Sequence, residues 1–212
     1  MRRFMLDETV SSFIKLGALL FIVGCSDDAV SNLVEDPQLN GRYMASDCES
    51  IGIGEAGISK KESLVFEING GFQKIEDYYT NADCSGEPAG TARLEGRYQV
   101  DGEGDSVTQG SHLGIELTNA YMVSRSANLS SIFTLSGYCG VNEFVTDEEI
   151  EITTNAGEGL CIVRESLPET LYGVYQEKDG VLFLNKGGLS EMGQSQQDRP
   201  NQLDQEKIYV KQ

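Results

Sequence analysis

The chain has 212 residues, of which 34 are acidic and 16 basic, so its formal net charge at pH 7 is −18. So acidic a chain excludes the phosphate binding of nucleic-acid-binding proteins, and it is repelled by anionic lipid head groups. The 24 glycines and the scarcity of helical patterns favour an all-β protein.

A short apolar run over residues 16–23 follows three basic side chains and ends two residues before Cys25. The run is far shorter than the roughly 20 residues that a membrane-spanning helix needs. It therefore predicts a cleaved signal peptide over residues 1–24. The alternative, a buried N-terminal helix, would need a second long apolar segment to pack against, and the sequence contains none.

Residues 22–24, Ile-Val-Gly, stand directly before Cys25, and this pattern resembles the lipobox of bacterial lipoproteins. The resemblance implies that Cys25 becomes the triacylated, palmitate-carrying first residue of the mature chain. Ser26 follows it where an aspartate would favour the inner membrane, so the resemblance implies a lipid anchor in the outer membrane of a Gram-negative bacterium, facing the periplasm. Each buried methylene contributes about 0.8 kcal/mol, so several acyl chains make a nearly permanent anchor.

Without residues 1–24, which carry three basic and two acidic side chains, the chain keeps 13 basic and 32 acidic residues, a balance of −19. Residues 25–38 are polar and acidic and contain Pro37, a composition typical of a flexible spacer. We therefore expect a lipidated N-terminus and tether over residues 25–38 and one domain over residues 39–212.

Four cysteines follow the tether, and an even number in an exported chain predicts two disulfides: Cys48, Cys84, Cys139 and Cys161. No pair has the C-x-x-C spacing of a zinc site, and the chain has one histidine, so we expect no metal. Three connectivities are possible. We favour Cys48 with Cys84 and Cys139 with Cys161, because each closes a loop of a few dozen residues and would stabilise by about 3 to 4 kcal/mol.

Period-two alternation predicts a series of short antiparallel strands along the domain. The first is residues 39–45, followed by a hairpin of residues 62–68 and 72–79 around a glycine-rich turn. Residues 92–100 alternate most clearly, with one apolar and one charged face. Further strands are expected at residues 113–117, 132–137, 149–153, 171–177, 181–185 and 207–211, helical turns at residues 120–126 or 142–149, and a polar, exposed loop at residues 187–204.

About nine or ten short strands with glycine-rich turns predict an all-β domain, namely a single antiparallel up-and-down β-barrel or half-barrel with two disulfides. Residues 39–43, 78–84 and 95–98 resemble the opening strands of lipocalin-like barrels, with Tyr43 where those barrels commonly carry tryptophan. Residues 182–184 and 199–200 resemble the lipid-binding domain of the adenomatosis-polyposis-coli-down-regulated family of Wnt inhibitors. The resemblance implies a barrel with a cavity for a hydrophobic ligand.

Several motifs are better explained by structure than by chemistry. Residues 52–57 match the dinucleotide pattern G-x-G-x-x-G, but no helix pattern follows, which indicates a surface loop. Residues 101–105 alternate carboxylates without the rest of a calcium loop, which indicates a hairpin tip. His112 is the only histidine, and of the carboxylates at residues 147–151, Glu149 and Glu151 fall on the solvated face of an expected strand. We therefore predict no enzyme activity and no cofactor.

The sequence thus predicts a binding protein. In the leading hypothesis a lipid or other hydrophobic small molecule lies inside the barrel, against inward apolar side chains: Phe66, Leu94, Tyr98, Val100 and Ile115. In the alternative the same side chains fill the barrel, and the chain is an envelope structural or protein-interaction lipoprotein that uses its acidic surface. A barrel of this size can be filled or hollow, so both stay open.

Overall fold

The computed structural model describes residues 36–51, 58–103, 110–156, 161 and 166–212, and the structural statements below concern these residues. Several predicted features lie outside the described residues: the signal peptide, Cys25, most of the tether, the glycine-rich motif at residues 52–57 and the acidic tip residues 104–105.

Ten strands, one α-helix and three short 3-10 helices make up the described part. The strands are β1 (Gly41–Ala45), β2 (Glu49–Ser50), β3 (Ser59–Phe66), β4 (Gly71–Tyr79), β5 (Gly90–Glu103), β6 (Ser111–Ser124), β7 (Glu149–Glu151), β8 (Glu169–Lys178), β9 (Val181–Asn185) and β10 (Leu203–Lys211). The helices are α1 (Ala127–Ser136), η1 (Tyr138–Gly140), η2 (Thr153–Asn155) and η3 (Gly188–Glu191).

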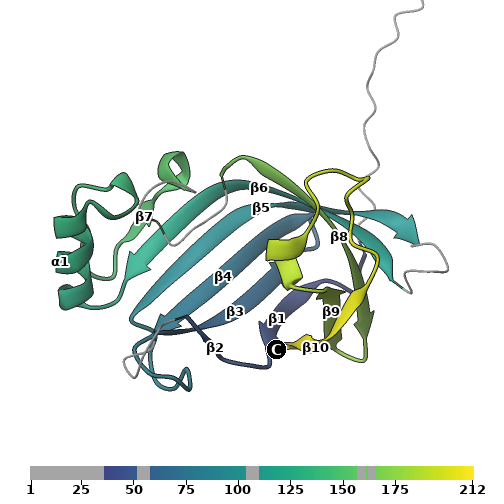
Figure 1. Ribbon diagram of the computed structural model, residues 1–212, viewed down its shortest axis with the longest axis horizontal. Coiled ribbons are helices and arrows are strands. Elements are labelled where there is room, and N and C mark those ends of the chain that lie inside the picture. Colours follow the sequence, from purple (N-terminus) through teal and green to yellow (C-terminus); the bar gives the residue numbers. More distant parts are fainter. Residues whose placement is uncertain (1–35, 52–57, 104–109, 157–160, 162–165) are drawn as a thin grey trace, which may run out of the picture. The chain divides into compact units, whose positions relative to one another are not determined.

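Eight of these strands close an antiparallel up-and-down barrel, which confirms the predicted fold class (Figure 1). Their spatial order is β1-β10-β9-β8-β6-β5-β4-β3, and β1 also pairs with β3 to complete the ring. Within the barrel each strand therefore lies beside its neighbours in the chain. The short strands β2 and β7 are additions that pair with β3 and β6.

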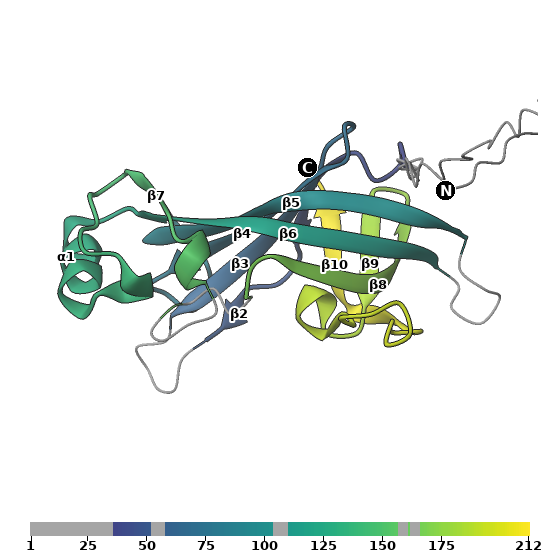
Figure 2. The ribbon, with the colours of Figure 1, turned by 90° about the horizontal axis from the view of Figure 1, so that it is seen from above.

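The strands differ greatly in length, and this shapes the interior. β5 and β6 have 14 residues each, whereas β1 and β9 have five. Figures 1 and 2 show the long strands extending past the short ones, toward α1 and β7. Because the short strands cannot cover the whole inner surface of the long ones, other segments complete that end of the barrel.

The alternation of buried and more exposed side chains along β5 agrees with the alternation of apolar and charged residues in the sequence. Ala92, Leu94, Tyr98 and Val100 are buried inside the barrel, and the charged residues between them are half-buried or exposed. Such burial of one strand face supplies most of the driving force for closing the ring, at roughly 25 cal/mol per Å² of apolar surface.

The strand expected at residues 132–137 is wrong, because α1 occupies most of this segment. Ser126 caps the helix by accepting a hydrogen bond from the Leu129 amide at 3.2 Å. Gly137 ends it in the left-handed conformation, with φ of 59°. Of the helical turns expected elsewhere, the one at residues 120–126 falls largely on β6, and residues 142–149 contain no helix.

The loop at residues 187–204 is only partly exposed. It forms η3, and Gly188, Leu189 and Met192 are buried. The Asn185 side-chain amide holds the start of η3 by donating to the Gly188 carbonyl at 2.8 Å. This segment is therefore a part of the barrel end and not a free loop.

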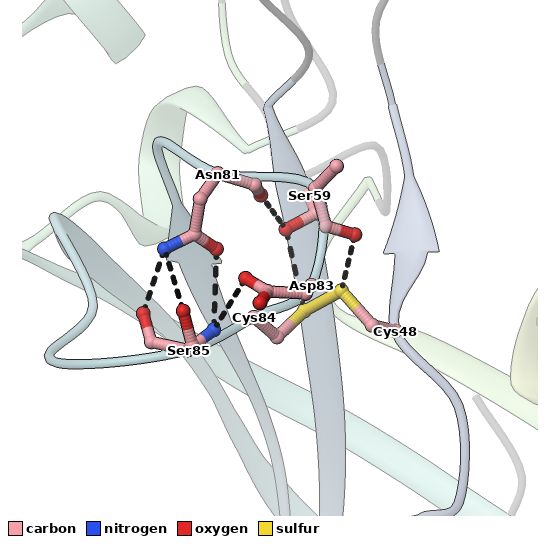
Figure 3. The surroundings of a disulfide bond; sticks show 7 residues. Cys48, Ser59, Asn81, Asp83, Cys84 and Ser85 are labelled. Carbon is pink, nitrogen blue, oxygen red and sulfur yellow. Dashed lines mark hydrogen bonds between the residues drawn. A yellow bond between two sulfur atoms is a disulfide. The ribbon is translucent and has the colours of Figure 1, made fainter.

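Both predicted disulfides form, with the favoured connectivity Cys48–Cys84 and Cys139–Cys161. Figure 3 shows the first, which ties the segment after β1 to the loop between β4 and β5. Beside it the Ser59 hydroxyl donates to the Asn81 carbonyl, and the Asn81 amide donates to the Ser85 carbonyl at 2.7 Å. The disulfide and these hydrogen bonds together fix that loop on β3.

Candidate ligand-binding site

The five side chains expected to line an apolar pocket all face the barrel interior and are almost fully buried: Phe66, Leu94, Tyr98, Val100 and Ile115. They belong to one continuous core. The Phe66 ring lies 5.2 Å from the Phe72 ring and 5.1 Å from the Tyr98 ring, between ring centroids. Since these side chains pack against one another, the apolar pocket stays a prediction, and neither cavity described below is lined by any of them.

The apolar half of the barrel receives the end of the expected tether. Leu39 is fully buried in the core just before β1 begins. The Tyr43 hydroxyl donates to the Gln38 carbonyl at 2.8 Å, and the Tyr175 hydroxyl donates to a carboxylate oxygen of Asp36 at 2.7 Å. Burial raises the pKa of both tyrosines, so they stay neutral donors. The chain therefore enters the domain at its apolar half.

The other half of the interior is charged. Lys60 and Glu62 on β3 occupy the same strand face as Leu64 and Phe66, because residues two apart point the same way. On β4, Lys74 and Glu76 follow Phe72 in the same manner, and the two strands pair so that Glu62 lies opposite Glu76. Three of these charged residues are no more than 6% exposed: Glu62, Lys74 and Glu76.

Glu76 lies at the centre of this charged half. Its carboxylate oxygen Oε1 lies 2.9 Å from Lys60 Nζ and 3.3 Å from Lys74 Nζ, and its other oxygen accepts a hydrogen bond from the Tyr78 hydroxyl. Burial alone would raise its pKa, but the charges of Lys74 and Lys60 and the hydrogen bonds from Tyr78 and Lys60 outweigh burial and lower the pKa of Glu76 to about 2. Glu76 is therefore ionised at neutral pH.

Glu62 is held differently. It accepts a hydrogen bond from the Tyr209 hydroxyl, whose pKa is raised by burial and by the nearby charge of Glu62. Its contacts with Lys74 and Lys207 are longer, at 3.9 and 3.8 Å. Both lysines are therefore less tightly bound to Glu62 than Lys60 is to Glu76.

A cavity of about 350 Å³ opens over this charged half, between β3, β4, β10 and η3. It has room for roughly a dozen water molecules. Three lysines and four carboxylates are among its lining residues, which are Ala45, Asp47, Glu49, Lys60, Glu62, Lys74, Gly187, Leu189, Ser190, Glu191 and Lys207. We call this cavity the charged mouth.

A second cavity, of about 550 Å³, lies on the outer face of the sheet and is lined by Arg42, Ile75, Asp77, Glu87, Pro88, Thr91, Arg93, Val123, Arg125 and Glu149. Among its charged residues, Arg93 and Glu149 pair with each other. Arg93 binds both carboxylate oxygens of Glu149, at 3.2 and 2.7 Å, and its guanidinium stacks over Tyr121 at 4.4 Å. Asp77 accepts a hydrogen bond from Thr91 at 2.7 Å.

No model of a protein family matches the chain, and no curated protein matches it either. Among the helices of the described residues, none is long and apolar enough to cross a membrane.

The charged mouth was not predicted from the sequence, although the pattern contains a signal for it. Lys60 and Glu62 are in phase with Leu64 and Phe66 at a period of two, so the alternation places them on the buried face. Ionisable residues are rarely buried unless they are paired, so this pattern marks both positions as candidates for a functional site.

Proposed function

We propose that this chain is a lipoprotein, anchored through Cys25 in the outer membrane and facing the periplasm, that binds a small polar molecule in the charged mouth of its barrel. The observation that carries the proposal is the set of buried ionisable side chains beneath an open cavity of about 350 Å³. Cavities of this volume are typical of small-molecule sites.

Stability alone does not account for these charges. Desolvating an ion pair costs several kcal/mol per ion, and well-packed apolar residues in its place are often neutral or stabilising. The opposite half of the same barrel is filled in that way, by Leu64, Phe66 and Phe72. Glu62, Lys74 and Glu76 therefore suggest a recognition role.

The described chain enters the barrel at the end opposite the charged mouth. Leu39, the last buried residue before β1, lies in the apolar half, whereas Ala45, at the other end of β1, lines the charged mouth. The described part of the chain therefore enters the barrel at the end of β1 away from the charged mouth.

A second candidate function is an envelope structural or interaction protein without a ligand. The dense packing of Phe66, Phe72 and Tyr98 favours it over a carrier of an apolar molecule, because such a ligand would have to displace aromatic side chains. The hydrophobic ligand expected from the sequence stays a prediction.

The test is a thermal-shift screen of the full chain, produced in a Gram-negative host and purified in mild detergent. The panel contains polar metabolites (amino acids, dipeptides, sugars, polyamines and carboxylic acids) and fatty acids of several lengths. We expect stabilisation by a polar compound, lost in Lys207→Met and kept in Lys178→Met, which removes an exposed charge at the end of β8. No response to any polar compound would refute the binding function.

The anchor has its own test. The mass of the N-terminal peptide should show a cleaved, acylated Cys25, and Cys25→Ala should release the protein from the membrane fraction. An unmodified Cys25 would overturn the anchoring part alone.

A further inference from the structure

Resting on the proposed function, we infer that the ligand is a small zwitterion, with an ammonium and a carboxylate group, of the size of an amino acid or a dipeptide. Within the part of the chain that the structure describes, one lysine ammonium and several carboxylates of the charged mouth have no ion-pair partner closer than 3.7 Å, and these groups face the same cavity.

The donor is Lys207, on β10. Its Nζ lies 3.8 Å from a carboxylate oxygen of Glu62 and 3.9 Å from one of Glu49, both beyond the usual hydrogen-bond range of about 2.7 to 3.2 Å. Lys60, by contrast, binds Glu76 at 2.9 Å. The three N–H groups of Lys207 can therefore turn toward a ligand carboxylate without breaking a short bond.

The acceptors lie on the rim. Asp47, Glu49 and Glu191 line the same cavity and are exposed. Glu49 contacts Lys60 at 3.7 Å and Lys207 at 3.9 Å, both long distances, and within the described residues no ion pair joins Asp47 or Glu191 to a cation. These carboxylates can receive a ligand ammonium while Lys207 binds its carboxylate.

A ligand with a single charge fits less well. An anion would meet four lining carboxylates and a strongly acidic protein, and a cation would meet three lining lysines. A zwitterion of matching length can place its carboxylate beside Lys207 and its ammonium beside the rim carboxylates. The volume of about 350 Å³ accommodates a dipeptide.

The experiment is isothermal titration calorimetry on the full chain in detergent, with three related probes: alanylalanine, N-acetylalanine and alaninamide. The first is a zwitterion, the second carries only the carboxylate and the third only the ammonium. We expect alanylalanine to bind at least tenfold more tightly than either of the others. Lys207→Met and Glu191→Gln should each weaken its binding by about tenfold, since each removes one charge-assisted contact, and Lys178→Met should not.

Equal binding of a singly charged probe would overturn the inference, and so would the absence of alanylalanine binding at millimolar concentration. If another polar compound still stabilises the protein in the thermal-shift screen, only the zwitterion is refuted and the proposed function stands. If no polar compound stabilises the protein, both the zwitterion inference and the proposed function are refuted. Near-ultraviolet circular dichroism of Lys207→Met and Glu191→Gln shows whether the variants are folded, and the comparison of the three probes on the unaltered chain needs no variant.

Discussion

Tyr209 on β10 donates its hydroxyl hydrogen to Glu62 on β3, across the strand β1 that lies between them. Ala45 on β1 pairs with Tyr209, and its small side chain leaves space for this contact. The hydrogen bond therefore joins β10 to β3 at the point where β1 closes the ring. It also fixes one carboxylate at the base of the charged mouth.

Tyr209→Phe tests this contact, because the substitution removes one hydroxyl from a fully buried residue and leaves Glu62 without its donor. We expect a loss of about 1 to 3 kcal/mol in the free energy of unfolding, measured by urea denaturation. Tyr121→Phe is the matched control, since Tyr121 is half-buried on β6. Equal effects of the two substitutions would show that the Glu62 contact adds nothing.

Glu76 should make the barrel sensitive to acid. Its pKa falls from 4.5 to about 2 on folding, so its ionised form contributes about 3 kcal/mol of stability above pH 4.5. That contribution is lost as the pH falls from 4.5 through 2. Glu76→Gln should therefore be destabilised by about 3 to 5 kcal/mol at pH 7, because Lys60 and Lys74 lose their shared partner.

The measurement is the midpoint of thermal unfolding from pH 7 to pH 2. The slope below pH 4.5 should be shallower in Glu76→Gln than in the unaltered protein. Glu116→Gln, at an exposed position on β6, should keep the original slope. Parallel curves for Glu76→Gln and the unaltered protein would contradict the role of this residue.

The two disulfides should differ in their effect on binding. Cys48 lies between Asp47 and Glu49, which line the charged mouth, whereas the Cys139–Cys161 bond connects η1 to the segment before β8. Replacing either pair with serine should cost about 3 to 4 kcal/mol, since the bonds close loops of 36 and 22 residues.

Only the Cys48→Ser, Cys84→Ser variant should also weaken binding of the polar ligand in the charged mouth. Calorimetry at a temperature where both variants remain folded checks this difference. An equal loss of affinity in the two variants would mean that the rim does not depend on the nearby disulfide.

The cap of α1 gives a local prediction. Ser126→Ala removes the acceptor for the Leu129 amide and should cost about 1 kcal/mol in unfolding free energy. Ser131→Ala, at an exposed position inside the same helix, should be neutral or slightly stabilising, because alanine favours the helix more than serine does. A larger loss from Ser131→Ala than from Ser126→Ala would contradict the assigned cap.

Much of the barrel can be predicted from alternation and turn chemistry. β9 coincides with the expected strand, residues 181–185, and the hairpin of β3 and β4 turns at the expected glycines. The two disulfides have the connectivity that loop length favoured among the three possible ones. α1 was missed because Ile132 and Phe133 favour a strand locally, and its caps, Ser126 and Gly137, lie outside the apolar stretch.

The charged mouth was missed for a different reason. Charged residues are usually assigned to the solvent-facing side of a strand. The alternation of period two instead assigns Lys60 and Glu62 to the buried face, and the structure agrees with the alternation. Lys74 and Glu76 lie on β4, which pairs with β3 in the expected hairpin. Tyr209 and Lys207 lie on β10, which only the closed ring brings close to β3. A pattern within one strand does not contain that information.

The most direct test of the central claim is the identity of the molecule that travels with the protein. The full-length chain would be purified from the envelope in mild detergent and denatured, and the released small molecules would be identified by mass spectrometry. The account predicts a polar, ionic molecule that is depleted in Lys207→Met and retained in Lys178→Met. A fatty acid or other apolar molecule, present equally in both variants, would contradict it.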